Sequence, residues 1–370
     1  MNGRKLFFHK PATIGFVTFA KIFIMDEQKL TSIAELGEFG LIDHLTKEIK
    51  LTQKTTVTGV GDDAAVLNIS DKNYTLISTD LLIEGVHFDM AYTPLKHLGY
   101  KSAIVNFSDM AAMNGAPLQI VVSLAISSKY SLEALEEFYA GISKACELYN
   151  VDFVGGDTSS SVHGLFISVT VIGEVGKDKI TYRKGAKHGD ILCVTGDLGG
   201  AYIGLLLLER EKKVFQANPD MQPEMAGKEY ILKRQLKPEA RTDMVKKLKE
   251  EGIVPTAMID ISDGLASEAL HIAKSSGTGV VIYEERIPID QNTFDTAREF
   301  DLIPSLAALN GGEDYELLFT VSQKEYEKIK DMPGVSIIGY MTELAEGNRL
   351  ITPDNQSVEL KAQGWDALKK

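Results

Sequence analysis

The 370-residue sequence contains two cysteines, one tryptophan and no long uninterrupted apolar run. Cys146 and Cys193 are too few for a disulfide framework and lie in apolar segments, so we expect a reducing compartment, the cytoplasm. A membrane-spanning helix needs about 20 apolar residues, and the sequence offers no such stretch. Basic residues are also scarce, with 39 Lys and Arg against 52 Asp and Glu. The net charge of −13 argues against nucleic acid or an anionic membrane as the main partner.

The composition is otherwise that of an ordinary soluble globular protein, with 44% hydrophobic and 25% charged residues. The chain is long for a single core, so we expect two domains of about 150 to 200 residues each. Residues 176–189 are polar, basic and contain several glycines. We place the domain boundary in this stretch, which gives domains of residues 25–176 and 177–370.

The first 24 residues differ from the rest of the chain. They are basic and apolar, as in a signal segment, but Lys10, Pro11 and Lys21 interrupt the apolar run and no small-residue cleavage site follows. An ordinary acidic globular start opens at Met25. We therefore interpret residues 1–24 as a disordered extension or a mis-called start rather than as a targeting peptide.

Hydrophobic periodicity predicts alternating helices and strands in both halves of the chain. Residues 31–45, for example, place apolar side chains at every third position, as on one face of a helix. The expected helices are residues 31–45, 98–113, 132–149, 201–210 and 265–274. The expected strands are residues 64–69, 74–77, 118–126, 151–154, 165–174, 190–195, 279–283, 335–338 and 349–351, whereas residues 211–230 are expected to form a charged loop. This order predicts an α/β fold with mixed sheets, of the α+β type.

Acidic residues adjoin two short apolar segments, residues 64–69 and 74–77. Asp62-Asp63 comes after two glycines, and Ser78-Thr79-Asp80 comes directly after residues 74–77, where a strand should end. Adjacent carboxylates beside a buried strand repel each other and lose hydration, so a cation is needed to compensate. Oxygen ligands without a nearby lysine favour Mg²⁺. The alternative is a Gly-Asp hairpin turn followed by capping residues, which are common in turns.

Two further acidic positions in the first half each have a functional and a structural interpretation. Asp109 lies in the expected helix 98–113, which is otherwise small and apolar, with Lys101 two turns upstream. It either faces a site or caps the helix and faces solvent. Gly155-Gly156-Asp157 follows the expected strand 151–154. Such glycines can form a nest for phosphate oxygens while the Asp holds a counter-ion, but the triplet is equally an ordinary turn.

The second half repeats this arrangement. Asp260 is flanked by apolar residues at a strand end, whereas Asp263 can be the N-cap of the next helix. The run Gly196-Asp197-Leu198-Gly199-Gly200 precedes a helix but lacks the spacings of known phosphate-binding loops. We therefore favour a tight turn with a close-packed helix there. Gly311-Gly312-Glu313-Asp314 precedes another strand.

Five element ends with the same chemistry together indicate a common site: Asp62-Asp63, Ser78-Thr79-Asp80, Asp109, Gly156-Asp157, and Asp260 with Ser262 and Asp263. Unneutralised acids would repel one another and any phosphate, so several Mg²⁺ ions between carboxylates and a polyphosphate are the natural inference. Phosphoryl transfer requires mainly alignment and charge neutralisation. This chemistry suits a site that is rich in Asp and has no evident nucleophile.

Six motifs in this order also carry a family resemblance: GVGDDAAVL, STDLLIEGVHF, NFSDMAAMNGAP, VGGDT, IDISDGL and NGGEDYELLF. They resemble the thiamine-monophosphate kinase family, which is part of an ATP-binding superfamily with aminoimidazole ribonucleotide synthetase and selenophosphate synthetase. The match covers roughly residues 30–366. It implies a two-domain architecture like that of aminoimidazole ribonucleotide synthetase and a homodimer formed through the N-terminal sheets.

The resemblance implies direct transfer of a phosphoryl group from ATP, as co-substrate, to thiamine monophosphate, with several Mg²⁺ ions and no nucleophilic side chain. The implied metal ligands are Asp63, Ser78, Thr79, Asp80, Asp109, Asp157, Asp260 and Asp263. The implied ATP contacts are Asp63, Tyr139, Gly156, Asp157, Arg183 and Ser262. The implied contacts to thiamine monophosphate are His87, Glu313 and Trp365.

Two alternatives of different kinds remain. Another enzyme of the superfamily is one, although residues 1–58 contain no cysteine for selenophosphate chemistry and the chain ends in Leu-Lys-Lys rather than the cysteine of the hydrogenase maturation protein. A non-catalytic nucleotide-binding scaffold is the other. Such a scaffold would be expected to lose part of the acidic set, and it would bind ATP without turnover.

Overall fold

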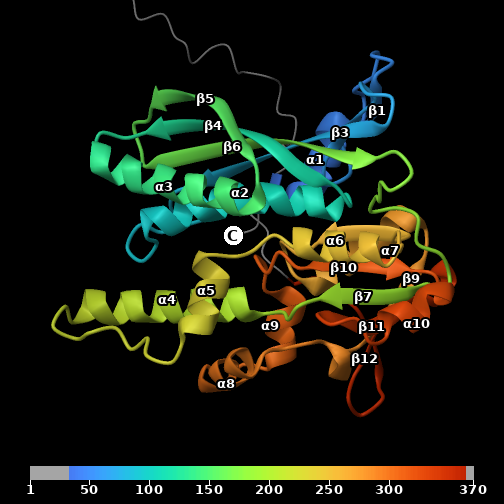
Figure 1. Ribbon diagram of the computed structural model, residues 1–370. Coiled ribbons are helices and arrows are strands. Elements are labelled where there is room, and N and C mark those ends of the chain that lie inside the picture. Colours follow the sequence, from blue (N-terminus) through green and yellow to red (C-terminus); the bar gives the residue numbers. More distant parts are fainter. Residues whose placement is uncertain (1–32, 364–370) are drawn as a thin grey trace, which may run out of the picture.

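Two β-sheets, one in each half of the chain, form the framework of the protein (Figure 1). The computed structural model describes residues 33–363, without the side chains of residues 34 and 35. The expected N-terminal extension of residues 1–24 and the predicted substrate contact Trp365 therefore lie outside the described residues. The last strand of the first sheet ends at Gly176 and the first strand of the second begins at Ile191.

The first sheet has six strands in the order β1-β2-β3-β6-β4-β5. Neighbouring strands are antiparallel, except that β4 and β5 are parallel. Helices α2 and α3 lie on the side of the sheet that faces the second half (Figure 1). The elements of this half are α1 (Ile33–Thr46), β1 (Thr56–Thr58), β2 (Ala65–Leu67), β3 (Asn73–Ile83), α2 (Leu95–Ala112), β4 (Ala116–Ile126), α3 (Leu132–Tyr149), β5 (Asp152–Ser160) and β6 (Leu165–Gly176).

The second sheet has seven strands in the order β13-β12-β9-β11-β7-β10-β8, antiparallel except for β12 and β9. Its interior strands β7 and β10 are buried along their whole length. Its strands are β7 (Ile191–Thr195), β8 (Ala257–Asp260), β9 (Gly279–Tyr283), β10 (Leu317–Val321), β11 (Val335–Thr342), β12 (Asn348–Ile351) and β13 (Ser357–Glu359). Its helices are α4 (Gly200–Ala217), α5 (Glu229–Leu236), α6 (Thr242–Glu250), α7 (Leu265–Ser276), α8 (Gln291–Glu299), α9 (Pro304–Asn310) and α10 (Tyr326–Ile329).

Helix α2 joins the two halves. It is buried on nearly all sides, as expected for a helix without a polar face. It approaches α3 very closely, because a Cβ atom at Gly99 would lie 1.9 Å from the Phe138 carbonyl oxygen and one at Gly141 2.0 Å from that of Lys96. Its C-terminal residue Ala112 packs in one hydrophobic cluster with residues of the second half. Side chains on α2 are therefore held rigidly between the two halves.

Most regular elements agree with the periodicity, and α3 and β9 coincide with the expected ranges 132–149 and 279–283. Three strand ends were predicted too early, one of them at Ile338, because β11 continues to Thr342. Strand β3 does not end at Ile77 but continues to Ile83, because β6 offers a backbone partner for every residue from 73 to 83. Ser78, Thr79 and Asp80 are therefore strand residues rather than loop residues.

Strand β5 likewise continues past the predicted turn. Gly155, Gly156 and Asp157 pair in parallel with β4, so neither the nest nor the ordinary turn considered for them forms. A Cβ atom at Gly156 would lie 1.8 Å from the Val122 carbonyl oxygen. This glycine therefore permits close strand packing. The predicted loop at residues 211–230 is also partly wrong, because α4 extends to Ala217 and buries Glu211 against the backbone N–H of Glu224 at 2.8 Å.

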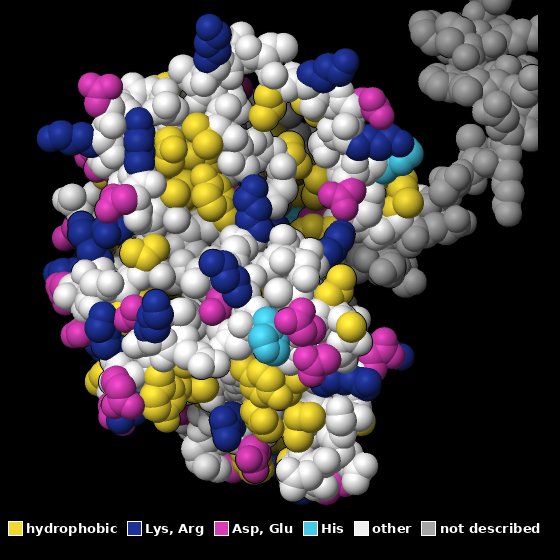
Figure 2. Space-filling view, turned by 90° about the vertical axis from the view of Figure 1, so that its right-hand side faces the viewer, with side chains coloured by type: hydrophobic (Ala, Val, Ile, Leu, Met, Phe, Trp, Pro, Cys, Tyr) yellow, Lys and Arg dark blue, Asp and Glu magenta, His cyan; other side chains and the backbone are white. Residues whose placement is uncertain are grey.

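Charged side chains of both signs are interspersed on the face seen in Figure 2, between clusters of hydrophobic side chains. No broad basic surface is visible on this face. Within residues 33–363, none of the helices combines the length and apolar character needed to cross a membrane.

Candidate functional site

A large cavity of about 1650 Å³ lies between the two halves of the chain and is lined by both. The first half contributes β3, the loop after it and one face of α2. The second half contributes the loop after β8, the loop before β10 and parts of α4 and α9. Eleven of the residues predicted for the site line this cavity: Asp63, Ser78, Thr79, Asp80, His87, Asp109, Arg183, Asp260, Ser262, Asp263 and Glu313.

Three carboxylates from distant parts of the sequence meet at one end of the cavity. Oxygen atoms of Asp63, Asp109 and Asp260 all lie within 4.8 Å of one another. Burial, reinforced by Asp63, raises the pKa of Asp260 to about 7. Burial also raises the pKa of Asp109 well above its usual value, with Asp80 as the next cause. Asp80 has its own pKa raised to about 6 by burial and by Glu38 of α1.

Each carboxylate of the cluster is held in place by a neighbouring donor. Ser78 Oγ donates to Asp109 Oδ2 and Ser108 Oγ donates to Asp260 Oδ2, both at 2.5 Å. Arg183 donates to Asp63 Oδ1 from Nη2 at 2.6 Å and from Nε at 3.1 Å. Asp63 Oδ2 is buried and has no hydrogen-bond partner among the described residues. One arginine among several buried acids leaves negative charge uncompensated, and an oxygen donor set with an unpartnered oxygen fits a hard divalent cation.

Asp62 and Asp63 have different surroundings. Asp62 Oδ1 accepts hydrogen bonds from the backbone N–H groups of Asp63 at 3.1 Å and Arg183 at 3.2 Å. Burial raises the pKa of Asp62 to about 6, and the charge of Asp63 adds to the effect. Asp62 therefore supports the backbone around the cluster, whereas Asp63 belongs to it.

A second set of polar residues lies further along α2. Lys101 Nζ is 2.8 Å from Glu313 Oε1, and Gln235 Nε2 donates to Glu313 Oε2 at 2.7 Å. His87 Nδ1 accepts a hydrogen bond from the backbone N–H of Ile83 at 3.0 Å. Burial lowers the pKa of His87 below its ordinary value, so its imidazole is neutral near pH 7. The predicted substrate contact Glu313 therefore pairs with a buried ammonium group, and the charges of both act on the predicted substrate contact His87.

The loop that carries Glu313 has a strained backbone. Glu313 and Tyr315 have φ angles of 66° and 53°, in the left-handed region that costs non-glycine residues about 1–2 kcal/mol each. The backbone N–H of Glu313 donates to the Ser262 carbonyl oxygen at 2.7 Å, and that of Tyr315 to Ile261 at 2.9 Å. The same loop therefore fixes Glu313 and braces the segment between Asp260 and Asp263.

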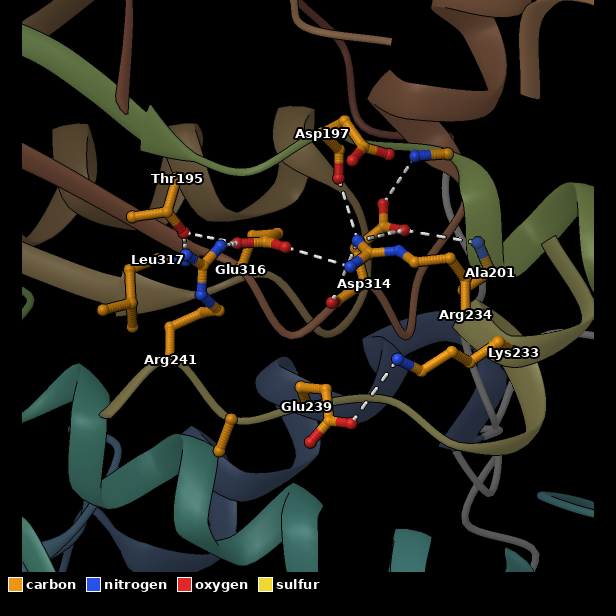
Figure 3. Close-up of polar contacts among 12 residues, drawn as sticks. Thr195, Asp197, Ala201, Lys233, Arg234, Glu239, Arg241, Asp314, Glu316 and Leu317 are labelled. Atoms are coloured by element: carbon orange, nitrogen blue, oxygen red, sulfur yellow. Dashed lines mark hydrogen bonds and ion pairs between the residues drawn. The ribbon is translucent and has the colours of Figure 1, made fainter. Parts of the chain in front are cut away.

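Two arginines, Arg234 and Arg241, stabilise this loop through its buried acidic residues (Figure 3). Glu316 lies between their guanidinium groups, with Arg234 Nη1 donating to Oε1 at 3.0 Å and Arg241 Nη1 donating to Oε2. Arg234 Nη2 also reaches the Asp314 carbonyl oxygen at 3.3 Å. Thr195 Oγ1 donates to Glu316 Oε2 at 2.5 Å. Positive charge from α5 and the segment after it thus neutralises the buried acids of the loop.

The glycine-rich turn before α4 is not a phosphate site. Asp314 Oδ2 accepts from the backbone N–H of Gly199 at 2.7 Å, and Oδ1 accepts from that of Ala201 at 3.3 Å. A carboxylate of the protein already occupies the helix N-terminus, where negative charge is favoured. The prediction of a tight turn with a close-packed helix is confirmed.

Three predicted ATP or metal contacts do not line this cavity. Tyr139 lies on α3, and Gly156 and Asp157 lie on the edge strand β5. The N-cap of α7 is Gly264 rather than Asp263, so the alternative role suggested for Asp263 is wrong. Asp263 instead lines the cavity, and its backbone N–H donates to Glu268 Oε1 at 2.9 Å.

Several supporting residues were missed by the sequence reasoning. Ser108, Gln235 and Glu268 orient predicted site residues through the hydrogen bonds described above. Ser108 directly precedes Asp109, and this was the only local signal among the three. Gln235 and Glu268 lie in helices whose sequences show no motif.

Comparison with known proteins agrees with this arrangement. A family model described as AIR synthase related protein, N-terminal domain, matches residues 61–175, and its C-terminal counterpart matches residues 187–349. The chain is 34% identical to the thiamine-monophosphate kinase of Bacillus subtilis over 90% of this chain and 100% of that protein, and 36% identical to that of Aquifex aeolicus over 90% and 98%. The solved structure described as AaThiL complexed with AMPPCP and TMP has a TM-score of 0.76 and 33% identity, covering 92% of this chain and 99% of that one. These matches confirm the family resemblance and the two-domain α/β architecture.

Proposed function

Since this chain belongs to the thiamine-monophosphate kinase family, we propose that it transfers the γ-phosphoryl group of ATP to thiamine monophosphate, giving thiamine diphosphate and ADP. The observation that carries the proposal is the layout of the cavity. An acidic cluster lies at one end of α2 and the Lys101–Glu313 ion pair lies further along the same helix. A polyphosphate with its metal ions suits the first set, and a charged acceptor suits the second.

The chain's own residues provide alignment. Asp63, Asp109 and Asp260 would hold Mg²⁺, assisted by Asp80 and Asp263, which also line the cavity. When bound, Mg²⁺ neutralises charge on the phosphate oxygens as the transferred group moves. Ser78 and Ser108 fix the orientation of two of these carboxylates. Arg183 and Ser262 line the same part of the cavity and are proposed to contact the nucleotide phosphates.

The transfer is proposed to be direct, from donor to acceptor, since the cluster contains only metal-binding acids and no side chain arranged as a nucleophile. The test is to incubate the protein with ATP, Mg²⁺ and thiamine monophosphate and to separate the thiamine phosphates by chromatography. Formation of the diphosphate with one ADP per turnover supports the proposal. ATP binding without diphosphate would support the scaffold alternative, and phosphoryl transfer from ATP to another acceptor would support a different enzyme of the superfamily.

Mg²⁺ is expected to stabilise the protein more at about pH 8 than at about pH 5. In the metal-free protein the pKa values of Asp80 and Asp260 are raised to about 6 and about 7 from 3.8. The folded state therefore binds more protons than the unfolded state between about pH 4 and 7, and these two groups reduce stability as pH rises through that window. Mg²⁺ binds the ionised carboxylates and removes this loss. Thermal unfolding midpoints, measured with and without Mg²⁺ at the two pH values, check this prediction. An equal rise of the midpoint on adding Mg²⁺ at both pH values would contradict it.

We further propose that the protein is a homodimer that forms along β5. This strand is at the edge of its sheet, and Phe153 and Val154 are 45% and 57% exposed. Exposed apolar edge strands are usually covered in native proteins. The proposal assigns Gly156 and Asp157 to a cleft shared with the partner subunit, because they lie on β5 and do not line the cavity of their own chain.

Replacing Val154 with Asp is expected to convert the dimer to monomer in light scattering and to abolish activity.

A sharper test mixes two inactive variants, Asp157→Asn and Asp109→Asn, under conditions that exchange subunits. If each site uses Asp109 of one subunit and Asp157 of the other, mixed dimers contain one intact site and activity returns. Mixed dimers that stay inactive would contradict the shared site.

The cytoplasm is the proposed location. Cys146 and Cys193 are both buried and unpaired, as is usual for proteins of a reducing compartment.

A further inference from the structure

One ammonium group in the cleft keeps a hydrogen-bonding position for a ligand. Lys101 is only 4% exposed, and it lines the cavity. Its Nζ lies 2.8 Å from Glu313 Oε1 and donates to the Gln235 carbonyl oxygen at 3.2 Å. A lysine ammonium has three N–H donors. These two partners therefore leave one N–H for a molecule in the cavity.

The position of Lys101 relates it to the acidic cluster. Lys101, Val105 and Asp109 all line the cavity and are spaced four residues apart on α2, so they share one face of the helix. Eight residues of helix separate Lys101 from Asp109 by about 12 Å. If metal ions align the transferred phosphoryl group at Asp109, that group moves along this face toward Lys101. It would meet the acceptor before it reached Lys101, so the acceptor phosphate would lie between Asp109 and Lys101.

The other cations that line the cavity within residues 33–363 are already more fully matched to acids. Arg183 donates twice to Asp63, at the cluster itself. Lys212 lies 2.5 Å from Asp89 Oδ2 and 3.6 Å from Glu209 Oε1, so two carboxylates share its charge. Lys101 has one carboxylate partner, Glu313, whose other oxygen accepts from Gln235. Lys101 is thus, outside the acidic cluster, the cation best able to accept a further anion.

The Lys101–Glu313 pair is also complementary in charge to the proposed acceptor. Thiamine monophosphate carries a positive heterocycle and a negative phosphate. If the pair separates to admit it, the ammonium faces the phosphate and the carboxylate faces the ring. Both buried charges then remain paired, so the exchange avoids the large cost of an isolated buried ion.

We propose that Lys101 binds the phosphate group of the acceptor and thereby selects thiamine monophosphate over unphosphorylated thiamine. This inference rests on the proposed function, since it concerns the acceptor of the same cleft. The test compares the dissociation constants of the two ligands by titration calorimetry, with the full-length protein, Mg²⁺ and the ATP analogue AMPPCP. The ratio of the two constants measures what the acceptor phosphate contributes.

Wild-type protein is expected to favour thiamine monophosphate, and Lys101→Met to reduce that preference by about tenfold or more, as for a hydrogen bond to a charged group. Lys101→Arg should retain most of the preference, because it retains the charge. Glu313→Gln should weaken the binding of both ligands to a similar extent. If Lys101→Met does not fold, Lys101→Gln, which is polar but uncharged, provides the same comparison.

Two results would overturn the inference: an unchanged preference in the uncharged Lys101 variants, or a loss of preference in Lys212→Met equal to that in Lys101→Met. Its failure is distinct from failure of the proposed function. Wild-type protein that forms the diphosphate while the uncharged Lys101 variants keep the preference contradicts the role of Lys101 alone. Wild-type protein that neither binds thiamine monophosphate nor forms the diphosphate contradicts both.

Discussion

Replacing Asp109 with Asn is expected to lower turnover by about 100-fold or more, while raising the thermal stability of the metal-free protein. Asp109 lies in the acidic cluster, and burial together with Asp80 and Asp260 raises its pKa well above the usual value. Removing its charge relieves repulsion in the empty site but deprives the transferred phosphoryl group of a metal ligand. Asparagine keeps an oxygen that can still accept from Ser78, so the fold is preserved.

The two effects are measured separately, by steady-state turnover at saturating Mg²⁺ and by thermal unfolding in the presence of a chelator. Asp178→Asn is a suitable control, since Asp178 is 79% exposed and forms only a surface pair with Lys179. The control should change neither quantity appreciably. Wild-type turnover in Asp109→Asn would rule out a metal role for this residue. A decrease in stability of the metal-free variant would show that the cluster is not a site of repulsion.

Replacing Arg234 with Met is expected to reduce the free energy of unfolding by about 3–5 kcal/mol, the usual cost of removing one partner from a buried ion pair. The guanidinium of Arg234 contacts Glu316 at 3.0 Å and Asp314 at 3.4 Å, and both carboxylates have fully or nearly fully buried side chains (Figure 3). Arg241 can compensate only Glu316. The variant therefore leaves Asp314 buried without its counter-ion.

Urea unfolding at a fixed protein concentration measures this loss. The matched control is Lys233→Met, one residue earlier on α5, whose side chain is 60% exposed and lies 3.8 Å from Glu239 (Figure 3). Surface pairs of this kind contribute at most about 1 kcal/mol. Arg234→Met should also lower turnover, because the loop holding Glu313 and bracing residues 261–262 loses its support. A loss of stability no larger than that of the control would contradict the role assigned to Arg234.

The sequence predicted the elements whose burial follows a regular period. Helix α3 was predicted to the residue because its apolar positions form one stripe. Strand β3 was predicted to end too early because Ser78-Thr79-Asp80 is polar, as in a loop. These residues are held in a strand by β6, whose residues are about 90 positions away in the sequence. Local patterns contain no information on such a distant partner.

The acidic residues of the cleft were predicted from the motifs, but their grouping was not. Sequence reasoning could not separate Asp63, Asp109 and Asp260, which share a cluster, from Asp157, which lies on the edge strand β5. The ion pair between Lys101 and Glu313 joins residues more than 200 positions apart. Their proximity depends on how the two halves pack, and no spacing rule expresses that packing.

The burial of α2 between the two halves has a consequence for folding. Ala111 and Ala112 share a hydrophobic cluster with Cys193 and Met258 of the second half. A fragment ending after β6 would expose this apolar surface to water, and a fragment beginning at β7 would lose the helix that covers its own core. The halves are therefore not interchangeable modules. We therefore expect them to depend on each other for stability and to unfold as one cooperative unit rather than domain by domain.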